Sequence, residues 1–288
     1  MYETFTLRET SRGRIEGVHW PLADAKQIVC IVHGIGEYGG RYDRVATRFN
    51  EAGIAVLSMD LRGHGNSVGK KGECAPRADV LDDISALLTC AQLKYPGLPI
   101  ILYGHSMGGN ITLDYRCRGG MNDVPVAYLI SAPWIRLTKP IPEPAYWGVK
   151  LLAKLAPKLT VGSAVDEDLL GNPASVLPYN DNPMVHNRIS SLCAVDGFSI
   201  GRALERGKLE DNGRASNIPM LIMHGGADMI CDPQATRIVA DRLQKQGEPV
   251  EYIEWEGLYH EIHNGGPDST GDEVIDRMIE FITSFQEA

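Results

Sequence analysis

Short apolar runs that alternate with helical patterns constrain the fold of this chain more than any other feature. The runs are rich in Val, Ile and Leu, and they occupy residues 27–34, 54–60, 99–104 and 124–133. Helical patterns follow at residues 44–53, at residues 80–95 and after Ser106. Strands that are apolar on both faces, each followed by a helix, are typical of a parallel sheet covered on both sides. The sequence therefore predicts an α/β fold.

Two segments depart from this alternation. Residues 4–10 and 14–20 indicate an antiparallel hairpin at the edge of the sheet, with Arg12 and Gly13 at its turn. From Trp134 to about Asn217 the chain is irregular and rich in proline, after which strand and helix patterns resume. We therefore expect one α/β core made of residues 1–133 and 218–288, with residues 134–217 inserted as a cap.

The composition excludes several classes of protein. The chain has 288 residues, 43% of them hydrophobic, which is enough for a large core. A net charge of −9 argues against nucleic acid, because binding to a phosphate backbone needs clustered Lys and Arg. The polar N-terminus lacks the apolar run of a signal peptide, and no stretch approaches the roughly 20 apolar residues of a membrane span. We therefore expect a cytoplasmic protein, and the sequence sets no expectation for its oligomeric state.

The six cysteines are scattered singly and form no paired motif. Such a pattern indicates reduced, mostly buried thiols rather than a disulfide framework or a metal site. No motif for a metal or an organic cofactor is present, so the sequence predicts neither.

The sharp corner in the stretch "ILYGHSMGG" is the strongest chemical signal. Gly104 and Gly108 stand two residues before and two residues after Ser106, where an apolar strand turns directly into a helix. Glycine removes the Cβ atoms that would collide in such a turn, and the central side chain is held up at the carboxyl end of the sheet. A chance glycine-rich turn is the alternative, but the flanking strand and helix favour a nucleophile elbow. Ser106 is therefore the candidate nucleophile.

A serine nucleophile needs a base and an acid, here in the chain order Ser, Asp, His. Asp228 follows an apolar strand, and His260 follows the last strand. Their rivals are Asp232 and His263. Because Asp232 directly precedes Pro233 and a helical run, it is expected to cap that helix instead. The remaining histidines do not follow Asp228 in the chain, so we assign them structural or peripheral roles.

The tetrahedral intermediate of acyl transfer also needs fixed N–H donors. One donor comes from the residue after the nucleophile, which is Met107, and one from the loop after the third strand. That loop, "HGIGEYGG", is rich in glycine and would aim the N–H of Ile35 inward. A plain strand-to-helix connection is the alternative interpretation of this loop.

With these elements in place, the sequence resembles the monoacylglycerol lipase family of α/β-hydrolases, whose neighbours include lysophospholipases and serine aminopeptidase-like hydrolases. The likeness covers nearly the whole chain. It rests on the stretches "HGIGEYGGRY", "DLRGHGNSVG", "YPGLPIILYGHSMGG", "GGADMICDP" and "LYHEIHN". The insertion is the part whose likeness is weakest.

The resemblance implies an α/β-hydrolase fold with a mostly parallel eight-stranded sheet, helices on both faces and an inserted helical cap. By motif, it implies a triad of Ser106, Asp228 and His260, with Ile35 and Met107 as backbone oxyanion donors. It also implies that Glu37, Arg41 and His263 line a pocket for the alcohol part of the substrate. The alternative for these three residues is a solvated ion pair and loop packing.

A helical pattern in the insertion carries an apolar row. Trp147, Leu151 and Leu155 recur at a spacing of four, and Lys150, Lys154 and Lys158 fall on another face. One interpretation is a helix whose apolar row packs over the active site. The other is a basic, apolar surface that rests transiently on a membrane or micelle. Both interpretations stay open at this stage.

The sequence thus predicts a serine hydrolase that cleaves carboxylic esters of monoacylglycerol-like lipids through an acyl-enzyme intermediate. A short-chain, aryl or lysophospholipid carboxylesterase is the alternative within enzymes. A ligand receptor that keeps the fold without turnover is the alternative outside enzymes.

Cys231 lies three residues after Asp228, so its thiol is either close enough to the triad for modification to disturb it or buried and inert.

Overall fold

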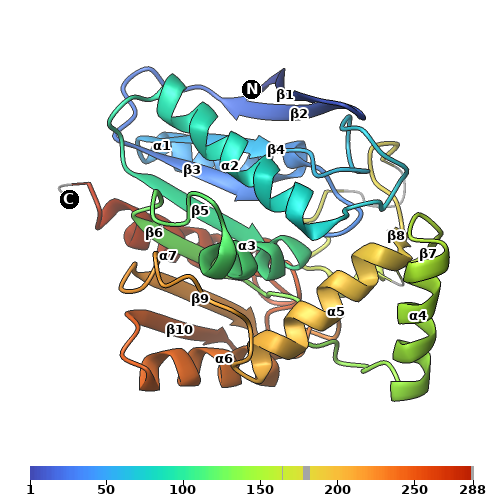
Figure 1. Ribbon diagram of the computed structural model, residues 1–288. Helices are drawn as coiled ribbons and strands as arrows, with labels where there is room; N and C mark the ends of the chain where they lie inside the picture. The colour runs from blue at the N-terminus through green and yellow to red at the C-terminus, as the bar shows by residue number, and fades with distance from the viewer. Residues whose placement is uncertain (164, 178–181, 287–288) are drawn as a thin grey trace.

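The centre of the molecule is an eight-stranded sheet with the strand order β1-β2-β4-β3-β5-β6-β9-β10 (Figure 1). The computed structural model describes residues 1–163, 165–177 and 182–286. The strands are β1 (Glu3–Thr10), β2 (Gly13–Trp20), β3 (Gln27–Val32), β4 (Ile54–Met59), β5 (Ile100–His105), β6 (Ala127–Ser131), β9 (Met220–Gly225) and β10 (Val250–Trp255). All neighbouring pairs from β4 to β10 are parallel, whereas β2 is antiparallel to both β1 and β4. The predicted mostly parallel sheet is confirmed.

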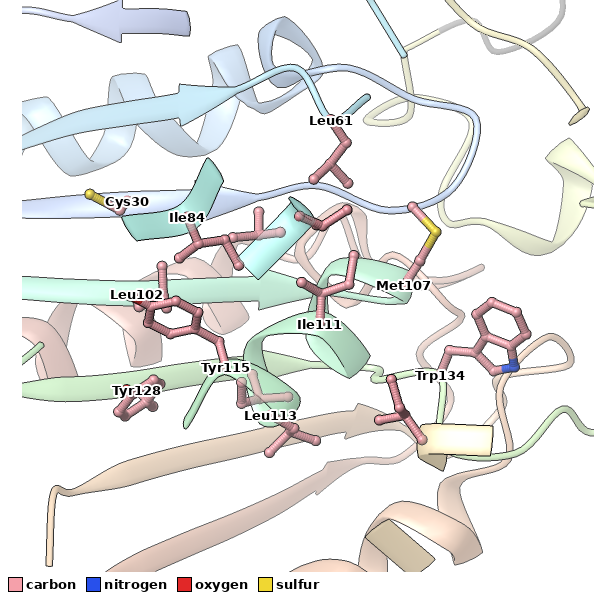
Figure 2. Close-up of a cluster of buried hydrophobic side chains, with 14 of the residues drawn as sticks. Cys30, Leu61, Ile84, Leu102, Met107, Ile111, Leu113, Tyr115, Tyr128 and Trp134 are labelled. Atoms are coloured by element: carbon pink, nitrogen blue, oxygen red, sulfur yellow. The ribbon is translucent and has the colours of Figure 1, made fainter. Parts of the chain in front are cut away.

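Helices cover both faces of this sheet, as predicted. One face is covered by α1 (Asp43–Glu51) and α7 (Asp272–Thr283), and the other by α2 (Arg77–Lys94), α3 (Met107–Arg118) and α6 (Pro233–Lys245). Successive residues of β3 point to opposite faces of the sheet. Ile31 packs in the layer that contains α1 and α7, and Cys30 packs in the layer that contains α2, α3 and α6. Figure 2 shows part of the layer beside Cys30, with Ile84, Leu102 and Ile111 in one buried cluster. Two buried layers fix the sheet on which the site is built.

The edge hairpin is present, but its turn lies one residue earlier than predicted. Thr10 pairs with Gly13, so the two-residue loop is Ser11–Arg12 and Gly13 opens β2. Gly13 has a φ of 130°, and a Cβ there would stand 2.9 Å from Cγ2 of Val68. Glycine is therefore needed for its backbone conformation and for the space beside β2.

The segment between β6 and β9 is more regular than its sequence indicates. It holds α4 (Glu143–Leu155), β7 (Thr160–Gly162), the 3-10 helix η2 (Glu167–Leu169), β8 (Arg188–Ser190) and α5 (Ser191–Glu205). Strands β7 and β8 form a small antiparallel pair. Figure 1 shows α4 beside α5 at one end of the sheet. The predicted cap range of 134–217 includes residues 164 and 178–181, which lie outside the described residues.

Helix α5 packs against the chain just after β6 at very short range. A Cβ on Gly197 would lie 2.5 Å from the Trp134 ring, and one on Gly201 would lie 2.1 Å from the carbonyl oxygen of Ile135. Two glycines four residues apart lie on one face of a helix, so they let that face meet the neighbouring chain closely. Helix α5 is thereby seated directly on the core.

Helix α4 is oriented differently from the inward-packing interpretation of its sequence. Trp147, Leu151 and Leu155 are 61%, 59% and 75% exposed, so the row that was expected to pack inward faces solvent. Another set of apolar side chains, with Val149 and Leu152, faces the interior instead. Inward packing of the 147–151–155 row is therefore wrong, because α4 is apolar on two faces. In the described part of the chain, none of the helices has the length and apolar character needed to cross a membrane.

Candidate active site

Ser106 occupies the turn between β5 and α3 in a strained backbone conformation. Its φ is 55° and its ψ is −118°, a region that side-chain-bearing residues rarely adopt. A Cβ on Gly104 would stand 2.3 Å from Oγ1 of Thr112, and one on Gly108 would stand 2.0 Å from the carbonyl oxygen of Val32. Both glycines of the motif are thus required by close contact. The turn leaves Ser106 at the carboxyl end of the sheet.

Ser106, His260 and Asp228 form a continuous hydrogen-bonded chain. The Ser106 hydroxyl lies 2.8 Å from Nε2 of His260, and Nδ1 of His260 lies 2.6 Å from Oδ2 of Asp228. All three side chains are buried. The other carboxylate oxygen of Asp228 accepts backbone N–H bonds from Ile230, at 2.7 Å, and from Cys231, at 3.0 Å. The structure therefore brings together all three residues that the sequence assigned to the triad.

Charge and burial compete at this chain of residues. Burial alone lowers the pKa of His260, but attraction to Asp228 and the hydrogen bond between them outweigh it, so the pKa is raised. Burial alone raises the pKa of Asp228, but His260 and another histidine, His224, outweigh it and hold the pKa well below its usual range. Asp228 is therefore an anion that stabilises a proton on His260. The arrangement can take the Ser106 proton onto Nε2.

Asp232, the rival acid, has the structural role that was predicted for it. Its carboxylate accepts the N–H of Gln234 at 2.9 Å and caps α6. It also pairs with Arg136 at 2.7 Å. Asp232 therefore stabilises the start of α6 and the adjoining part of the insertion.

The loop after β3 is fixed beside Ser106 by two side chains. The N–H of Gly34 donates to Glu37, and the imidazole of His33 contacts the carbonyl oxygen of Gly34 at 2.8 Å. Burial lowers the pKa of His33 to about 4, so this imidazole is neutral at physiological pH. Ile35 follows and lines the space in front of Ser106. Met107 is the first residue of α3, so its N–H lacks an acceptor within the helix. Ile35 and Met107 thus both lie next to Ser106, and their role as oxyanion donors stays a prediction.

The expected alcohol-binding residues form a buried charged cluster with one member that the sequence analysis missed. Arg41 lies between two carboxylates, at 3.4 Å from Glu37 and 3.1 Å from Glu261. In the sequence, nothing distinguishes Glu261 from an ordinary charged residue of the histidine loop. Burial and the neighbouring Glu261 raise the pKa of Glu37, against the attraction of Arg41. Burial lowers the pKa of His263 to about 4, and its ring stacks on Tyr42.

Two cavities meet at Ser106. A small one of about 30 Å³ is bordered by Glu37, His105 and Glu261 together with apolar side chains such as Val165 and Leu170. Arg41 and His263 do not line it and lie behind the first row of side chains. A larger cavity of about 320 Å³ runs beneath the insertion and is lined almost entirely by apolar groups, among them Trp134, Leu152 and Phe198. Ser106 therefore lies where a small space bordered by two carboxylates meets a larger apolar one.

Cys231 lines the apolar cavity but is itself 1% exposed. Burial and the charge of Asp228 raise the pKa of its thiol well above the usual value, against a hydrogen bond with Ser106. The thiol is therefore close to the triad and stays protonated at physiological pH.

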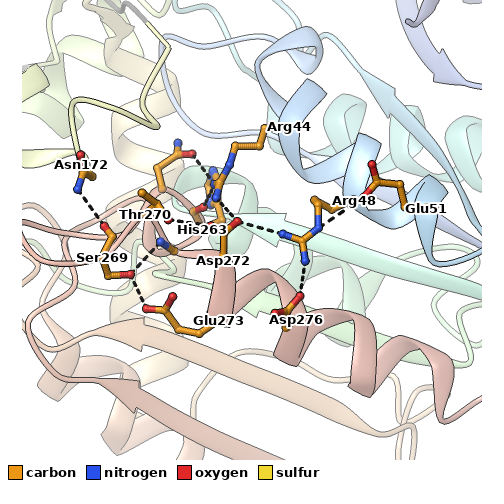
Figure 3. Close-up of polar contacts among 12 residues, drawn as sticks. Arg44, Arg48, Glu51, Asn172, His263, Ser269, Thr270, Asp272, Glu273 and Asp276 are labelled. Atoms are coloured by element: carbon orange, nitrogen blue, oxygen red, sulfur yellow. Dashed lines mark hydrogen bonds and ion pairs between the residues drawn. The ribbon is translucent and has the colours of Figure 1, made fainter.

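The loop that carries His260 is tied to the core and to the insertion. Arg44 of α1 donates to the carbonyl oxygen of His263, and Arg48 pairs with Asp272 at 3.0 Å (Figure 3). On the other side, the N–H of Glu261 donates to the carbonyl oxygen of Leu170 at 2.6 Å. The position of His260 therefore depends on α1, on α7 and on the insertion.

Among the described residues, no cluster of His, Cys, Asp and Glu has an arrangement that could hold a metal ion.

Comparison with known proteins gives a consistent result. Residues 23–266 match the family described as serine aminopeptidase, S33. A monoacylglycerol lipase from Mycolicibacterium smegmatis is 31% identical over 248 residues, which cover 85% of this chain and 84% of that protein. Human monoglyceride lipase is 26% identical over 255 residues, which cover 88% of this chain and 81% of that protein.

The fold is shared with a solved structure of monoglyceride lipase from Saccharomyces cerevisiae. That structure superposes with a TM-score of 0.81 at 24% identity, covering 99% of this chain and 95% of that chain. Because the family match spans most of the sequence and the fold agrees, the chain belongs to the serine aminopeptidase S33 family of α/β-hydrolases and is monoacylglycerol lipase-like over most of its length.

Proposed function

We propose that this protein is a serine hydrolase that cleaves carboxylic esters of monoacylglycerol-like lipids. His260 takes the proton of Ser106 as the hydroxyl oxygen attacks the ester carbonyl, and Asp228 stabilises the imidazolium that forms. The backbone N–H groups of Ile35 and Met107 hold the oxyanion of the tetrahedral intermediate. His260 then protonates the leaving alcohol, which leaves an acyl group on Ser106.

Deacylation repeats these steps with water. His260 takes a proton from the water, the hydroxide attacks the acyl carbonyl, and the proton passes to Ser106 as the fatty acid leaves. The strained elbow keeps the Ser106 hydroxyl in one place through both halves of the cycle. The segment over the site acts as a cap that keeps bulk water from the acyl chain.

The observation that supports the substrate class is the position of Ser106 between the two cavities. An apolar cavity of about 320 Å³ suits a fatty acyl chain, and the carboxylates of Glu37 and Glu261 in the wall of the smaller space are able to accept hydrogen bonds from the hydroxyl groups of an alcohol. A scissile ester at Ser106 would place one part of the substrate in each. A monoacylglycerol has this amphipathic shape.

A panel of esters tests this proposal. We expect the highest kcat/KM for a monoacylglycerol and lower values for di- and triacylglycerols, a lysophospholipid, an aryl acetate and the methyl ester of the same fatty acid. A phosphonate ester should label Ser106 alone. Highest activity on the lysophospholipid or aryl ester would contradict the alcohol part of the proposal, and labelling of another serine would contradict the mechanism. A burst of product without steady turnover would indicate a receptor on the same fold.

The outer face of α4 is the proposed contact with lipid surfaces. Trp147, Leu151 and Leu155 project from this helix, and the Lys150 ammonium lies 4.8 Å from the centre of the Trp147 ring. Lysine beside exposed apolar side chains suits an anionic lipid surface. The inner face of the same helix lines the apolar cavity, so contact with a surface would bring lipid to the entrance.

Substituting two exposed residues tests this contact. We expect the double variant Trp147→Ser, Leu151→Ser to bind anionic phospholipid vesicles less than the wild type and to hydrolyse vesicle-embedded monoacylglycerol more slowly. Its activity on a water-soluble ester should be unchanged. Leu93→Ser on α2 is the matched control, since Leu93 is 77% exposed and lies outside the insertion. Equal vesicle binding by the double variant and the wild type would contradict the proposal.

A further inference from the structure

Besides His260, one more histidine contacts the carboxylate of Asp228. His224 is the fifth residue of β9, and its Nε2 lies 3.0 Å from Oδ2 of Asp228, the same oxygen that accepts from His260. His224 is fully buried. The order of the triad along the chain had excluded it from the site, because His224 precedes Asp228. In space it lies directly behind the acid.

The other contacts of His224 show that its Nε2 carries hydrogen. Nδ1 lies 2.9 Å from the hydroxyl of Thr236 on α6, and Nε2 also lies 3.2 Å from the carbonyl oxygen of Cys231. A carboxylate and a carbonyl can only accept, so Nε2 carries hydrogen and donates to both. Nδ1 contacts the Thr236 hydroxyl, which is able to donate or to accept. The ring is thus held at both ends by groups outside the triad.

The carboxylate of Asp228 is constrained at both oxygens. Oδ1 accepts from the N–H groups of Ile230 and Cys231, and Oδ2 accepts from His224 and His260. The two backbone bonds fix one oxygen. The bond from His224 is the contact that fixes the other oxygen independently of His260. Without it, Oδ2 would keep only the bond from His260, and the orientation of the carboxylate would depend on the two backbone bonds to Oδ1 alone.

We propose that His224, held by Thr236, is a positioning residue that acts on His260 through Asp228. This inference rests on the proposed function. The N–H of His224 presents the positive end of a bond dipole to Oδ2 and so limits how strongly Asp228 attracts the proton of His260. Ground-state imidazolium cannot act as a base, so such a limit keeps more of the enzyme in its active form.

Other groups also act on the proton of His260, and the experiment has to hold them constant. The titratable and charged groups that face the His260–Asp228 pair are Glu37, Arg41, His105, His224, Cys231, Glu261 and His263. None of these is changed in the variants below except His224. The shift expected on its removal is therefore attributed to the His224 side chain.

The test compares His224→Leu with His224→Gln. A glutamine amide can donate to Asp228 and accept from Thr236, whereas leucine fills similar space and does neither. The readout is kcat and KM for a water-soluble ester between pH 5 and pH 9, with the active fraction counted by phosphonate titration. For His224→Leu we expect kcat to fall roughly ten- to a hundredfold, as for loss of a hydrogen bond to a charged group, with little change in KM.

The pH profile separates positioning from packing. Removal of the donor should raise the pKa of His260, so the acid limb of kcat/KM should move to higher pH in His224→Leu. His224→Gln should keep the limb near its wild-type position and recover most of kcat. A fold defect would lower the active fraction in both variants without moving the limb. An unmoved limb in His224→Leu, or equal impairment of the two variants, would overturn the proposal.

Thr236 supplies another series of variants that does not touch the triad. Thr236→Val removes the hydroxyl that orients His224, so we expect a smaller loss of kcat and a smaller shift of the acid limb in the same direction. Thr236→Ser should match the wild type. If His224→Leu does not fold, the comparison of Thr236→Val with Thr236→Ser tests the inference instead. Identical pH profiles of kcat/KM for these two variants would contradict it. A wild type that neither hydrolyses esters nor reacts with the phosphonate would instead defeat the proposed function.

Discussion

The two sides of Ser106 are built by different kinds of interaction. On the polar side, each functional side chain is held by directional hydrogen bonds: Ser106 to His260, His260 to Asp228, and Gly34 to Glu37. On the apolar side, the wall of the large cavity is made of side chains such as Leu152 and Phe198, whose contacts have no fixed direction. Changes to the triad should therefore affect every substrate, whereas changes to the walls of the cavities should affect the choice among substrates.

Removal of the acid or the nucleophile is the strongest test of this division. Ser106→Ala and Asp228→Asn should lower kcat/KM roughly 10⁴-fold or more on long-chain and short-chain esters alike, because both halves of the reaction use them. Steady-state assays on two acyl lengths measure the effect, and thermal melts check that the variants fold. A loss of activity confined to long-chain esters would show that Ser106 and Asp228 are not required for the hydrolysis of every ester.

A bulky residue on the apolar side should discriminate by acyl length. In Leu152→Trp we expect kcat/KM for a long-chain ester to fall roughly ten- to a hundredfold, because the larger side chain fills space meant for the acyl group, while an acetyl ester is affected little. Leu151→Trp is the matched control, since Leu151 is the adjacent residue on the exposed face of α4. An equal loss of kcat/KM on the long-chain and the acetyl ester would contradict the proposal that the apolar side of Ser106 selects among acyl groups.

The pH profile tests the balance of charge on the polar side. His260 must be neutral to act as a base, and its pKa is raised above the ordinary 6.5 by Asp228. Activity should therefore fall about tenfold per pH unit below a midpoint that lies above 6.5. Asp228 stays ionised throughout this range, because its pKa is held below its usual value. A midpoint well below 6.5 for a soluble ester would contradict this balance of charge.

The carboxylates beside the small cavity should contribute a modest selectivity for the alcohol. Glu37→Gln should shrink the preference for a monoacylglycerol over the methyl ester of the same acid by about tenfold, which is the effect of one hydrogen bond. His263→Ala should shrink it less, because His263 does not line this cavity. The ratio of the two kcat/KM values is the readout, since it cancels any general loss. A larger effect from His263→Ala would place His263 in the wall of the alcohol pocket.

The smallest expected effect comes from an acid that lies near the site but outside it. Asp232→Ala should lower the free energy of unfolding by about 1 kcal/mol through loss of the cap on α6, and should leave ester hydrolysis within about twofold. Denaturant titration and the ester assay measure the two quantities. A large loss of activity without loss of stability would exchange the roles of Asp228 and Asp232.

The polar side could be predicted largely from the sequence, because its chemistry requires particular residues at particular points of the chain. Gly104, Ser106 and Gly108 define the elbow locally, and Asp228 and His260 each follow a strand. His224 and Glu261 could not be found in this way. The expected order Ser, Asp, His excluded His224 from the site, because His224 precedes Asp228 in the chain. Glu261 resembles any charged residue of a loop, since only the folded chain places Arg41 beside it.

The apolar side was harder to predict for the opposite reason. Helix α5 contains Gly197 and Gly201, which lower helix propensity and interrupt an apolar pattern, although they are required by contact with Trp134 and Ile135. Helix α4 is apolar on two faces, so periodicity alone did not distinguish the face toward the cavity from the face toward solvent. The details of the insertion depend on packing that is not local in sequence.

The glycine contacts of α5 also determine which part of the insertion is bound most tightly to the core. The side-chain amide of Asn110 on α3 donates to the carbonyl oxygens of Trp134, at 2.8 Å, and Gly197, at 3.2 Å. Helix α5 is thus held, through its own backbone, to the helix that follows the nucleophile, and lifting it would separate close backbone contacts and expose buried polar groups. Helix α4 is attached mainly by side chains, such as the contact between Tyr146 and Ser199. In mechanical terms, α5 is the part of the insertion that is anchored to the core through its backbone, and α4 is the part that is held mainly by side-chain contacts.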